Sequence, residues 1–373
     1  MTEKRKLCVA VVFGGRSTEH DVSVISALGI LKNINRDKYN VQAVRITREG
    51  QWEMLSNPDT LDSAETLITR EGKMITFGGT KTHGFFRIGS SSAERKGIGI
   101  ERIPVDVVFP MLHGTFGEDG TVQGLLSMAG LPYVGAGVTA SALGMDKVMM
   151  KQLFFQNDIP AVDYLWFFRK DWNKLAGPIR KGATDEIGYP CFVKASNSGS
   201  SVSVFKAGDE NELTRYVNQA CQYDRKILVE KAIDARELEC AVLGNDEPEA
   251  SDVGEIIPAN EFYDYDAKYL NKSSKVIIPA DIPDKIAEQV RHLSVQAFKA
   301  LDCAGMARVD FLLERRTNRL FVNELNTIPG FTPISMYPKL WDSRGLSYDR
   351  LIDRLIELAI ERHLDCTQIK IVR

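Results

Sequence analysis

The segment MARVDFLLERRTNRLFVNELN spans residues 306–326 and contains two strand-like runs with polar residues in matching positions. Residues two apart in a strand share a face, so Arg308 lies with Asp310, and Glu324 lies with Asn326. A hairpin that turns about Thr317 would place Asp310 opposite Glu324 and Arg308 opposite Asn326, because the members of each pair are equidistant from that residue. The segment therefore predicts a buried hairpin with a polar cluster on one face.

This cluster is typical of a site for a hard metal ion. Two facing carboxylates destabilise a sheet unless a cation lies between them. Oxygen atoms of Asp310, Glu324 and Asn326, without His or Cys, suit Mg²⁺ held jointly with substrate phosphates. The alternative is a solvated hairpin face with an Arg–Asp ion pair, but the apolar flanks favour a buried sheet. These flanks are Phe311, Leu312, Leu320, Phe321 and Leu325.

The segment CFVKASNSGSSVSVF, residues 191–205, places small and hydroxyl-bearing residues in a loop between two strand-like runs. Small residues let backbone N–H groups approach phosphate oxygens, and hydroxyls add donors. A strand rather than a helix follows, so this is not a Walker A loop, whose pattern is absent from the sequence. A flexible Ser/Gly turn is the alternative. Lys194, at the start of the loop, favours a bound polyphosphate.

A competing nucleotide motif occurs at Gly135, Gly137 and Ala140, which satisfy G-x-G-x-x-[GA]. Asp163 lies at about the right distance for a ribose contact, which would indicate a dinucleotide oxidoreductase. The apolar run before the motif is only two residues long, and Pro160 interrupts the position of the next strand. The context therefore disfavours this interpretation.

The segment HGTFGEDG, residues 113–120, follows a strand-like run at 105–112. Ligands of open α/β sheets bind beyond the carboxyl ends of the strands, so His113 is well placed to contact one. The alternatives are a structural histidine and, for Glu118 and Asp119, acids that cap the next helix.

The wider pattern predicts two or three domains in 373 residues. Strands at 7–13 and 39–46, with a helix between them, indicate an open α/β sheet in the first third. Residues 57–102 are polar and weakly periodic. Further helices are expected at 146–156, 284–300 and 348–362.

The composition excludes several functional classes. A net charge of −3 provides no basic surface for nucleic acid or anionic lipid. The six cysteines lack metal-binding spacing, so they are expected to be reduced thiols. No apolar run approaches the roughly 18 residues of a membrane span. We expect a soluble, cytoplasmic protein whose partners are small molecules or another copy of itself.

Taken in order, these segments resemble the D-alanine:D-alanine ligases of the ATP-grasp superfamily, from Leu7 to about His363. The strings that carry the resemblance are GGRSTEHDVS (14–23), HGTFGEDGTVQG (113–124), MDK (145–147), FVKASNSGSSVSV (192–204), LVEKAI (228–233), FYDYDAKY (262–269), and RVDF with NELNTIPGFT (308–311 and 323–332). Each string alone is weak, but seven in sequence are specific.

The resemblance implies a three-domain α/β ATP-grasp fold. An N-terminal domain with an open parallel sheet (1–142) would precede a central subdomain (143–235) and a C-terminal catalytic domain with a lid loop (236–373). The last two would have antiparallel sheets with ATP between them. The family is typically homodimeric, and it uses ATP with two Mg²⁺ ions, for which Mn²⁺ can substitute.

The resemblance also implies roles for residues around ATP. Lys147 and Lys194 would contact its phosphates, with Ser200 and Ser201 on a loop that closes over them. Adenine and ribose would be bound by Glu230, Lys231 and Glu237, and Phe262 would also contact the nucleotide. Lys268 and Tyr269 belong to the lid, and Asp310, Glu324 and Asn326 match the ligands of the two metal ions.

For the amino acids, the resemblance implies that Glu19 and His113 hold the first D-alanine, with Glu19 bonded to its ammonium group. Arg308 and the Gly330 N–H match the oxyanion hole, and Ser335 with Met336 matches the pocket for the second amino acid. The implied reaction forms D-alanyl-D-alanine through D-alanyl phosphate, as a precursor of peptidoglycan. Ala195 and Ser203 depart from the Pro and Gly usual in the family, next to the phosphate loop; we expect altered loop closure with unchanged chemistry.

The lid and the second pocket bear on specificity. The pair Lys268–Tyr269 favours an amine nucleophile over D-lactate, and the apolar Met336 favours D-alanine over D-serine. One alternative is another ATP-grasp carboxylate–amine ligase, but only the dipeptide ligase pattern needs both Glu19 and the lid tyrosine. The other is a regulatory nucleotide-binding protein without catalysis, which the intact metal positions and Arg308 disfavour.

Overall fold

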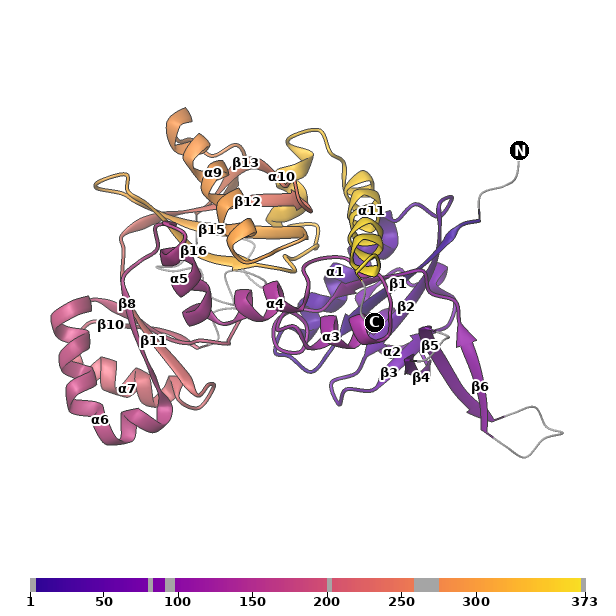
Figure 1. The fold of residues 1–373 in the computed structure, drawn as a ribbon, viewed down its shortest axis with the longest axis horizontal. Coiled ribbons are helices and arrows are strands. Elements are labelled where there is room, and N and C mark those ends of the chain that lie inside the picture. The colour runs from indigo at the N-terminus through magenta and orange to yellow at the C-terminus, as the bar shows by residue number, and fades with distance from the viewer. Residues whose placement is uncertain (1–4, 80–82, 91–97, 200–202, 258–274, 370–373) are drawn as a thin grey trace.

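The computed structural model describes residues 5–79, 83–90, 98–199, 203–257 and 275–369, which form three β-sheets with helices packed on them (Figure 1). The mixed α/β architecture agrees with the predicted class. Within these residues, no helix is both long enough and apolar enough to cross a membrane.

The N-terminal sheet has the order β6-β5-β4-β3-β2-β1-β7. Its strands are β1 (Leu7–Gly14), β2 (Tyr39–Ile46), β3 (Trp52–Leu55), β4 (Gly72–Gly79), β5 (His83–Ser90), β6 (Ile98–Ile103) and β7 (Val107–Met111). Only β2-β1-β7 are parallel, and the other strands pair antiparallel. The sheet is therefore mixed rather than purely parallel. The connections from β2 to β3 and from β4 to β5 are only a few residues long, which favours antiparallel pairing.

The strands β4 to β6 fall in the region where the sequence showed no clear periodicity. Their packing rests on a small aromatic cluster, in which the rings of Trp52 and Phe77 lie 4.7 Å apart and those of Phe77 and Phe85 lie 5.0 Å apart, both edge to face. Phe85 is fully buried. Aromatic contacts between β3, β4 and β5, together with the buried Ile75 and Ile103, thus hold this extension.

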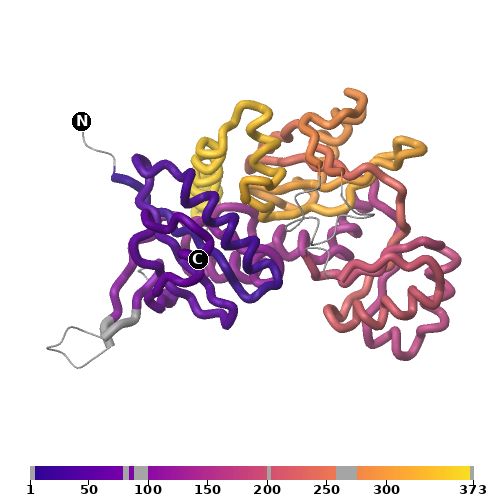
Figure 2. Tube along the Cα trace, turned by 180° about the vertical axis from the view of Figure 1, so that it is seen from behind, coloured from indigo at the N-terminus to yellow at the C-terminus, as the bar shows by residue number. Residues whose placement is uncertain are grey.

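The helices of the N-terminal part are α1 (His20–Asn33), η1 (Pro58–Thr60), α2 (Ala64–Thr69) and α3 (Thr121–Met128). The C-terminal helix α11 (Tyr348–Thr367) lies beside them, and both views show it next to the N-terminal sheet (Figures 1 and 2). Leu351 and Leu355 of α11 share a core with Ile30 of α1 and Phe109 of β7. The two ends of the chain therefore pack as one body.

The central sheet has the order β10-β9-β11-β8 and is antiparallel, as predicted. Its strands are β8 (Tyr164–Phe168), β9 (Cys191–Ala195), β10 (Val204–Ala207) and β11 (Lys226–Lys231). Three helical segments accompany it: α6 (Arg169–Gly182), η2 (Ala183–Ile187) and α7 (Glu210–Ala220). The Ser/Gly loop leaves the end of β9.

The C-terminal sheet has the order β14-β13-β12-β15-β16 and is also antiparallel. Its strands are β12 (Ala235–Gly244), β13 (Glu249–Ile257), β14 (Lys275–Ile277), β15 (Gly305–Glu314) and β16 (Leu320–Asn326). The helices packed here are α4 (Val138–Met145), α5 (Lys147–Gln156), α9 (Asp284–Ala300) and α10 (Met336–Asp342). Met150 and Phe154 of α5 share a core with Phe298 of α9, so α5 packs on this sheet although it precedes the central one.

The predicted hairpin is confirmed. β15 pairs with β16 so that Arg308 lies opposite Asn326 and Asp310 lies opposite Glu324. A register shift follows Asp310, and nearer the turn Phe311 pairs with Val322. Such a bulge bends the strand locally, next to the residues with candidate functions.

Candidate active site

Arg308 is the centre of the polar face of the hairpin. Its guanidinium donates to Asp310 through two hydrogen bonds, Nε to Oδ1 at 2.6 Å and Nη2 to Oδ2 at 2.7 Å, and it lies 3.0 Å from Glu239 Oε2. Asn326 Nδ2 donates to Asp310 Oδ2 at 3.0 Å. Glu239, on β12, lies opposite Asp310 and was not predicted as a site residue. The placement of Glu237 and Glu239 two residues apart, on one face of a strand, was the signal that could have indicated it.

Lys147 connects this cluster to the Ser/Gly loop. Its Nζ lies 3.4 Å from Glu324 Oε2 and donates to the Ser198 carbonyl at 2.9 Å. Lys147 is the first residue of α5, where the helix begins beside the end of β9. One ammonium group therefore links a candidate metal ligand to a candidate phosphate loop.

The donor set of Asp310, Glu324 and Asn326 fits a hard divalent cation, because all three offer oxygen and two of them are facing carboxylates. Within the described ranges, no three His, Cys, Asp or Glu side chains are grouped as a metal site, and the third member of this set is an amide. Arg308 and Lys147 supply positive charge to the two carboxylates.

Glu230, Lys194 and Lys151 form a charged triad, in which Lys151 lies one turn beyond Lys147 in α5. Glu230 Oε1 lies 3.2 Å from Lys194 Nζ, and its Oε2 lies 3.5 Å from Lys151 Nζ. Burial opposes ionisation of Glu230, but the two lysines outweigh it and lower the pKa of this carboxyl. Lys194 thus contacts the residue expected at the adenine. Lys151 was not predicted as a site residue, although it lies four residues after Lys147, so both side chains are on one face of the helix.

The remaining expected nucleotide contacts lie nearby on two strands. Lys231 ends β11 and is exposed, whereas Glu237 lies on β12 and is half-buried. These strands belong to the central and C-terminal sheets. Ser200, Ser201, Phe262, Lys268 and Tyr269 lie outside the described residues.

Glu19 forms the other end of the site, at the start of α1. It is buried, and its carboxylate lies against two glycine backbones. A Cβ added at Gly114 would lie 2.3 Å from Glu19 Oε2, and one added at Gly199 would lie 2.6 Å from the same atom. Glu19 therefore contacts the Ser/Gly loop one residue beyond the Ser198 carbonyl that Lys147 binds.

His113 lies beside Glu19 and is also buried. Its Nδ1 lies 3.0 Å from the Ile328 carbonyl, which can only accept, so Nδ1 carries the proton. Ser26 Oγ, 3.2 Å from Nε2, then donates to it and accepts from the Phe331 N–H at 3.2 Å. Burial lowers the pKa of His113, which agrees with this neutral form.

Glu118 joins two loops rather than capping a helix. It accepts from the Gly114 N–H at 2.8 Å and from the Ile328 N–H at 3.0 Å. Burial, with the charge of Glu19, raises its pKa to about 8. The N-cap of α3 is Gly120, and Asp119, one residue earlier, accepts from the backbone N–H of Thr121 at 3.1 Å.

The loop after β16 brings Gly330 and Ser335 together. A Cβ at Gly330 would lie 2.8 Å from Ser335 Oγ, which accepts from the Thr332 N–H at 3.0 Å. Met336 is buried and packs against β13, since a Cβ on Gly254 would lie 2.2 Å from its Cε. Ser335 therefore lies beside Gly330, and Met336 lies beside Gly254.

Two family models match the chain, one described as the D-ala D-ala ligase N-terminus (residues 8–136) and one as the D-ala D-ala ligase C-terminus (residues 153–357). A D-alanine--D-alanine ligase of Acetivibrio thermocellus is 50% identical over 98% of both chains. The chain belongs to the D-alanine--D-alanine ligase family.

Relatives of known structure agree with this membership. The D-alanine-D-alanine ligase of Coxiella burnetii is 36% identical, with a TM-score of 0.84 over 98% of this chain and 97% of that one. A D-Ala:D-Ser ligase of Enterococcus faecalis is 34% identical, with a TM-score of 0.82 over 95% and 100%. The family consists of ATP-dependent ligases that use a divalent metal, which agrees with the oxygen-rich cluster.

The dinucleotide interpretation finds no support. A Cβ at Gly305 would lie 3.1 Å from the backbone nitrogen of Gly135, and Arg362 donates to the Gly135 carbonyl at 2.6 Å. The G-x-G-x-x-A segment therefore packs tightly against β15 and α11. Gly135 has a φ of +94°, a left-handed conformation that favours glycine, so the turn itself accounts for this residue without a bound pyrophosphate.

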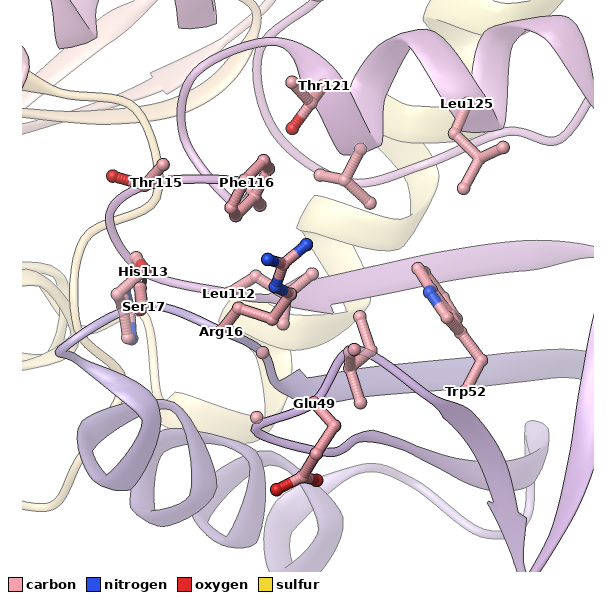
Figure 3. Close-up of a pocket in the computed structure, with 16 residues that line it drawn as sticks. Arg16, Ser17, Glu49, Trp52, Leu112, His113, Thr115, Phe116, Thr121 and Leu125 are labelled. Carbon is pink, nitrogen blue, oxygen red and sulfur yellow. Dashed lines mark hydrogen bonds between the residues drawn. The ribbon is translucent and has the colours of Figure 1, made fainter.

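A cavity of about 260 Å³ adjoins the Glu19 end of the site (Figure 3). Its wall includes His113 and Ser17, with Trp52 at the opposite side in the view. Arg16 lies over the Phe116 ring, with its guanidinium carbon 5.1 Å from the ring centroid. The cavity opens at the carboxyl ends of β1 and β7.

Proposed function

We propose that this chain is an ADP-forming ligase that joins two D-alanine molecules, through D-alanyl phosphate, to supply D-alanyl-D-alanine for peptidoglycan precursors. One observation supports this most directly. Lys147 binds the Ser198 carbonyl while Glu19 lies against Gly199, so the phosphate and amino-acid ends of the site meet at adjacent loop residues. A site that phosphorylates an amino-acid carboxylate needs this proximity.

The proposed reaction follows from the chemistry of a carboxylate, which is a poor electrophile. Its oxygen attacks the γ-phosphorus of ATP, ADP leaves, and an acyl phosphate forms. The free amine of the second D-alanine then attacks the carbonyl carbon, and phosphate leaves as the peptide bond forms. We expect Lys147 and Lys194 to stabilise phosphoryl charge.

Arg308 and the Gly330 N–H would bind the oxyanion of the tetrahedral intermediate. Such a donor is worth about 3 to 4 kcal/mol. Glu19 would hold the ammonium of the first D-alanine, aided by His113. Ser200 and Tyr269, on the phosphate loop and the lid, would help exclude water from the acyl phosphate.

We propose two Mg²⁺ ions, with Mn²⁺ as a substitute, held by Asp310, Glu324 and Asn326. When bound, they would neutralise charge on the transferred phosphoryl group. For the nucleotide we propose Glu230, Lys231 and Glu237 at adenine and ribose, with Ser201, Phe262 and Lys268 as further contacts. The all-oxygen donor set and the buried Glu230 support these assignments.

We also propose domain limits of 1–142, 143–235 and 236–373. Each contains one sheet, apart from Ala235, the first residue of β12. A cytoplasmic homodimer is proposed on the family resemblance.

The fold alone does not determine the second amino acid, because a D-Ala:D-Ser ligase shares it. We propose D-alanine, since Met336 offers no hydrogen-bond partner to a serine hydroxyl. The lid pair Lys268–Tyr269 supports an amine over D-lactate. Ser335, next to Gly330, would line the pocket.

The test is release of ADP and phosphate with ATP and Mg²⁺, using D-alanine alone, D-alanine with D-serine, D-alanine with D-lactate, and L-alanine, with products identified by mass. Turnover with D-alanine alone is expected. Glu19→Gln should raise the KM for D-alanine by more than the KM for ATP. Reaction only with a mixed pair would refute the proposed specificity, and no ATP consumption would refute the proposed function.

A further inference from the structure

Asp146 lies directly before Lys147 and makes contacts in three directions. Its Oδ1 accepts from the first-turn backbone N–H groups of α5 at 3.1 and 3.2 Å, which is an ordinary helix N-cap. The same side chain also reaches Ser196 and Lys226, which belong to the central sheet and its Ser/Gly loop. These added contacts exceed what capping requires.

Ser196 is fully buried and directs each of its polar groups at a neighbouring element. Its hydroxyl donates to Asp146 Oδ1 at 2.7 Å and accepts from the Val148 N–H at 3.2 Å. Its carbonyl accepts from the Lys147 N–H at 3.1 Å, and its own N–H donates to the Lys226 carbonyl at 3.0 Å. The first loop residue is thus fixed to α5 and β11.

The next two loop residues have separate attachments. Asn197 donates through its backbone N–H and Nδ2 to Asp224 Oδ2, at 2.8 and 2.9 Å. The Ser198 carbonyl accepts from Lys147 Nζ at 2.9 Å. Three consecutive residues therefore have defined positions before the loop reaches Gly199.

The Asp146–Lys226 ion pair joins two parts of the fold. Asp146 and Lys226 have side-chain exposures of 15% and 14%, so solvent screens the pair only partly. Burial alone would raise the pKa of Asp146, but hydrogen bonds from Lys226 and Ser196 lower it, which keeps the carboxylate charged. α5 packs on the C-terminal sheet, so the pair links that sheet to the central one.

We infer that Asp146 is a positioning residue for the ATP phosphates. It holds the loop base, residues 196–198, and the Lys147 backbone in one arrangement, so that the lysine ammonium and the loop face the same phosphate oxygens. Hydrogen-bond donors that are already fixed in position do not have to reorganise when negative charge develops on the phosphates during the reaction. The inference rests on the proposed function, which places those phosphates at Lys147.

The test compares ATP and adenosine binding to the full chain by calorimetry. Asp146→Ala should weaken ATP binding about tenfold and leave adenosine binding unchanged, because adenosine has no phosphates. The KM for ATP should rise while the KM for D-alanine stays constant. Asp146→Asn, which keeps the three Oδ1 contacts to Val148, Met149 and Ser196 but loses the charge, should have a smaller effect. Ser196→Ala should act in the same direction as Asp146→Ala.

Asp209 provides a matched control in the same part of the fold. It caps α7 by accepting from the Glu212 N–H at 2.8 Å, and this cap includes none of residues 196–198. Asp209→Ala should lower the Tm as Asp146→Ala does, without changing the ratio of ATP to adenosine affinity.

Four outcomes would overturn the inference. Equal weakening of ATP and adenosine by Asp146→Ala would show a merely structural role, as would an equal effect of Asp209→Ala on the affinity ratio. Unchanged ATP affinity in both Asp146→Ala and Ser196→Ala would refute it directly while leaving the proposed function standing. Failure of the unchanged chain to bind ATP would refute the proposed function and this inference together.

Discussion

Arg308 binds both carboxylate oxygens of Asp310, through Nε at 2.6 Å and Nη2 at 2.7 Å. A parallel pair of this kind fixes both side chains in direction as well as distance. Asp310 is a proposed metal ligand and Arg308 a proposed oxyanion donor. The carboxylate that orients the arginine is therefore also the one proposed to hold the metal.

Asp310→Asn should raise the Mg²⁺ concentration for half-maximal activity by at least about tenfold, because it removes a charged ligand and one anchor of Arg308. A Mg²⁺ titration of ATP turnover measures this. Glu314→Gln, at the far end of the same strand, should leave the titration unchanged. An unaltered Mg²⁺ requirement in Asp310→Asn would remove this residue from the metal site.

Gly199→Ala should raise the KM for the first D-alanine by about 10- to 100-fold. The new Cβ would lie 2.6 Å from Glu19 Oε2, so the carboxylate proposed to bind the substrate must move. Gly124→Ala in α3 is the control, since its Cβ meets nothing within 4 Å. This substitution should leave the KM for D-alanine unchanged and raise the free energy of unfolding by about 0.5–1 kcal/mol. An unchanged KM for D-alanine in Gly199→Ala would contradict the proposed role of Glu19 in binding that substrate.

Glu118 should make stability fall as pH rises. Its folded pKa, about 8, exceeds the ordinary value of 4.5 because of burial and the charge of Glu19. Between these values the unfolded chain releases a proton that the folded chain keeps, so the free energy of unfolding declines with pH. Urea unfolding at about pH 5 and about pH 8 should show a smaller decline in Glu118→Gln. Equal declines would contradict the raised pKa.

Lys151→Met should lower the free energy of unfolding at neutral pH by about 1–3 kcal/mol. Glu230 is buried and would lose one of its two cations while keeping Lys194, so the loss is smaller than for a fully broken pair. Chemical denaturation measures the change. Lys174→Met, on the exposed face of α6, should alter stability by less than about 0.5 kcal/mol. Equal stabilities of the two variants would show that Lys151 contributes nothing.

The sequence alone determined the strongly periodic elements and the pairing of the hairpin. The apolar runs of β1 and β2 and the helical spacing of α9 were readable because burial on one or both faces imposes a period on the residues. The pairing of Arg308 with Asn326 and of Asp310 with Glu324 followed because strand side chains alternate and a hairpin fixes equidistant partners.

Only the tertiary structure decided which distant residues meet. The contact of Glu19 with Gly199, the burial of Lys151 against Glu230 and the bridging role of Glu118 each join segments far apart in the chain. The same holds for β4 to β6, whose strands pack through buried aromatic and aliphatic side chains. A local sequence pattern indicates only which face of a helix or strand is buried. These contacts, and the raised pKa of Glu118, depend instead on how the three sheets pack together in the tertiary structure.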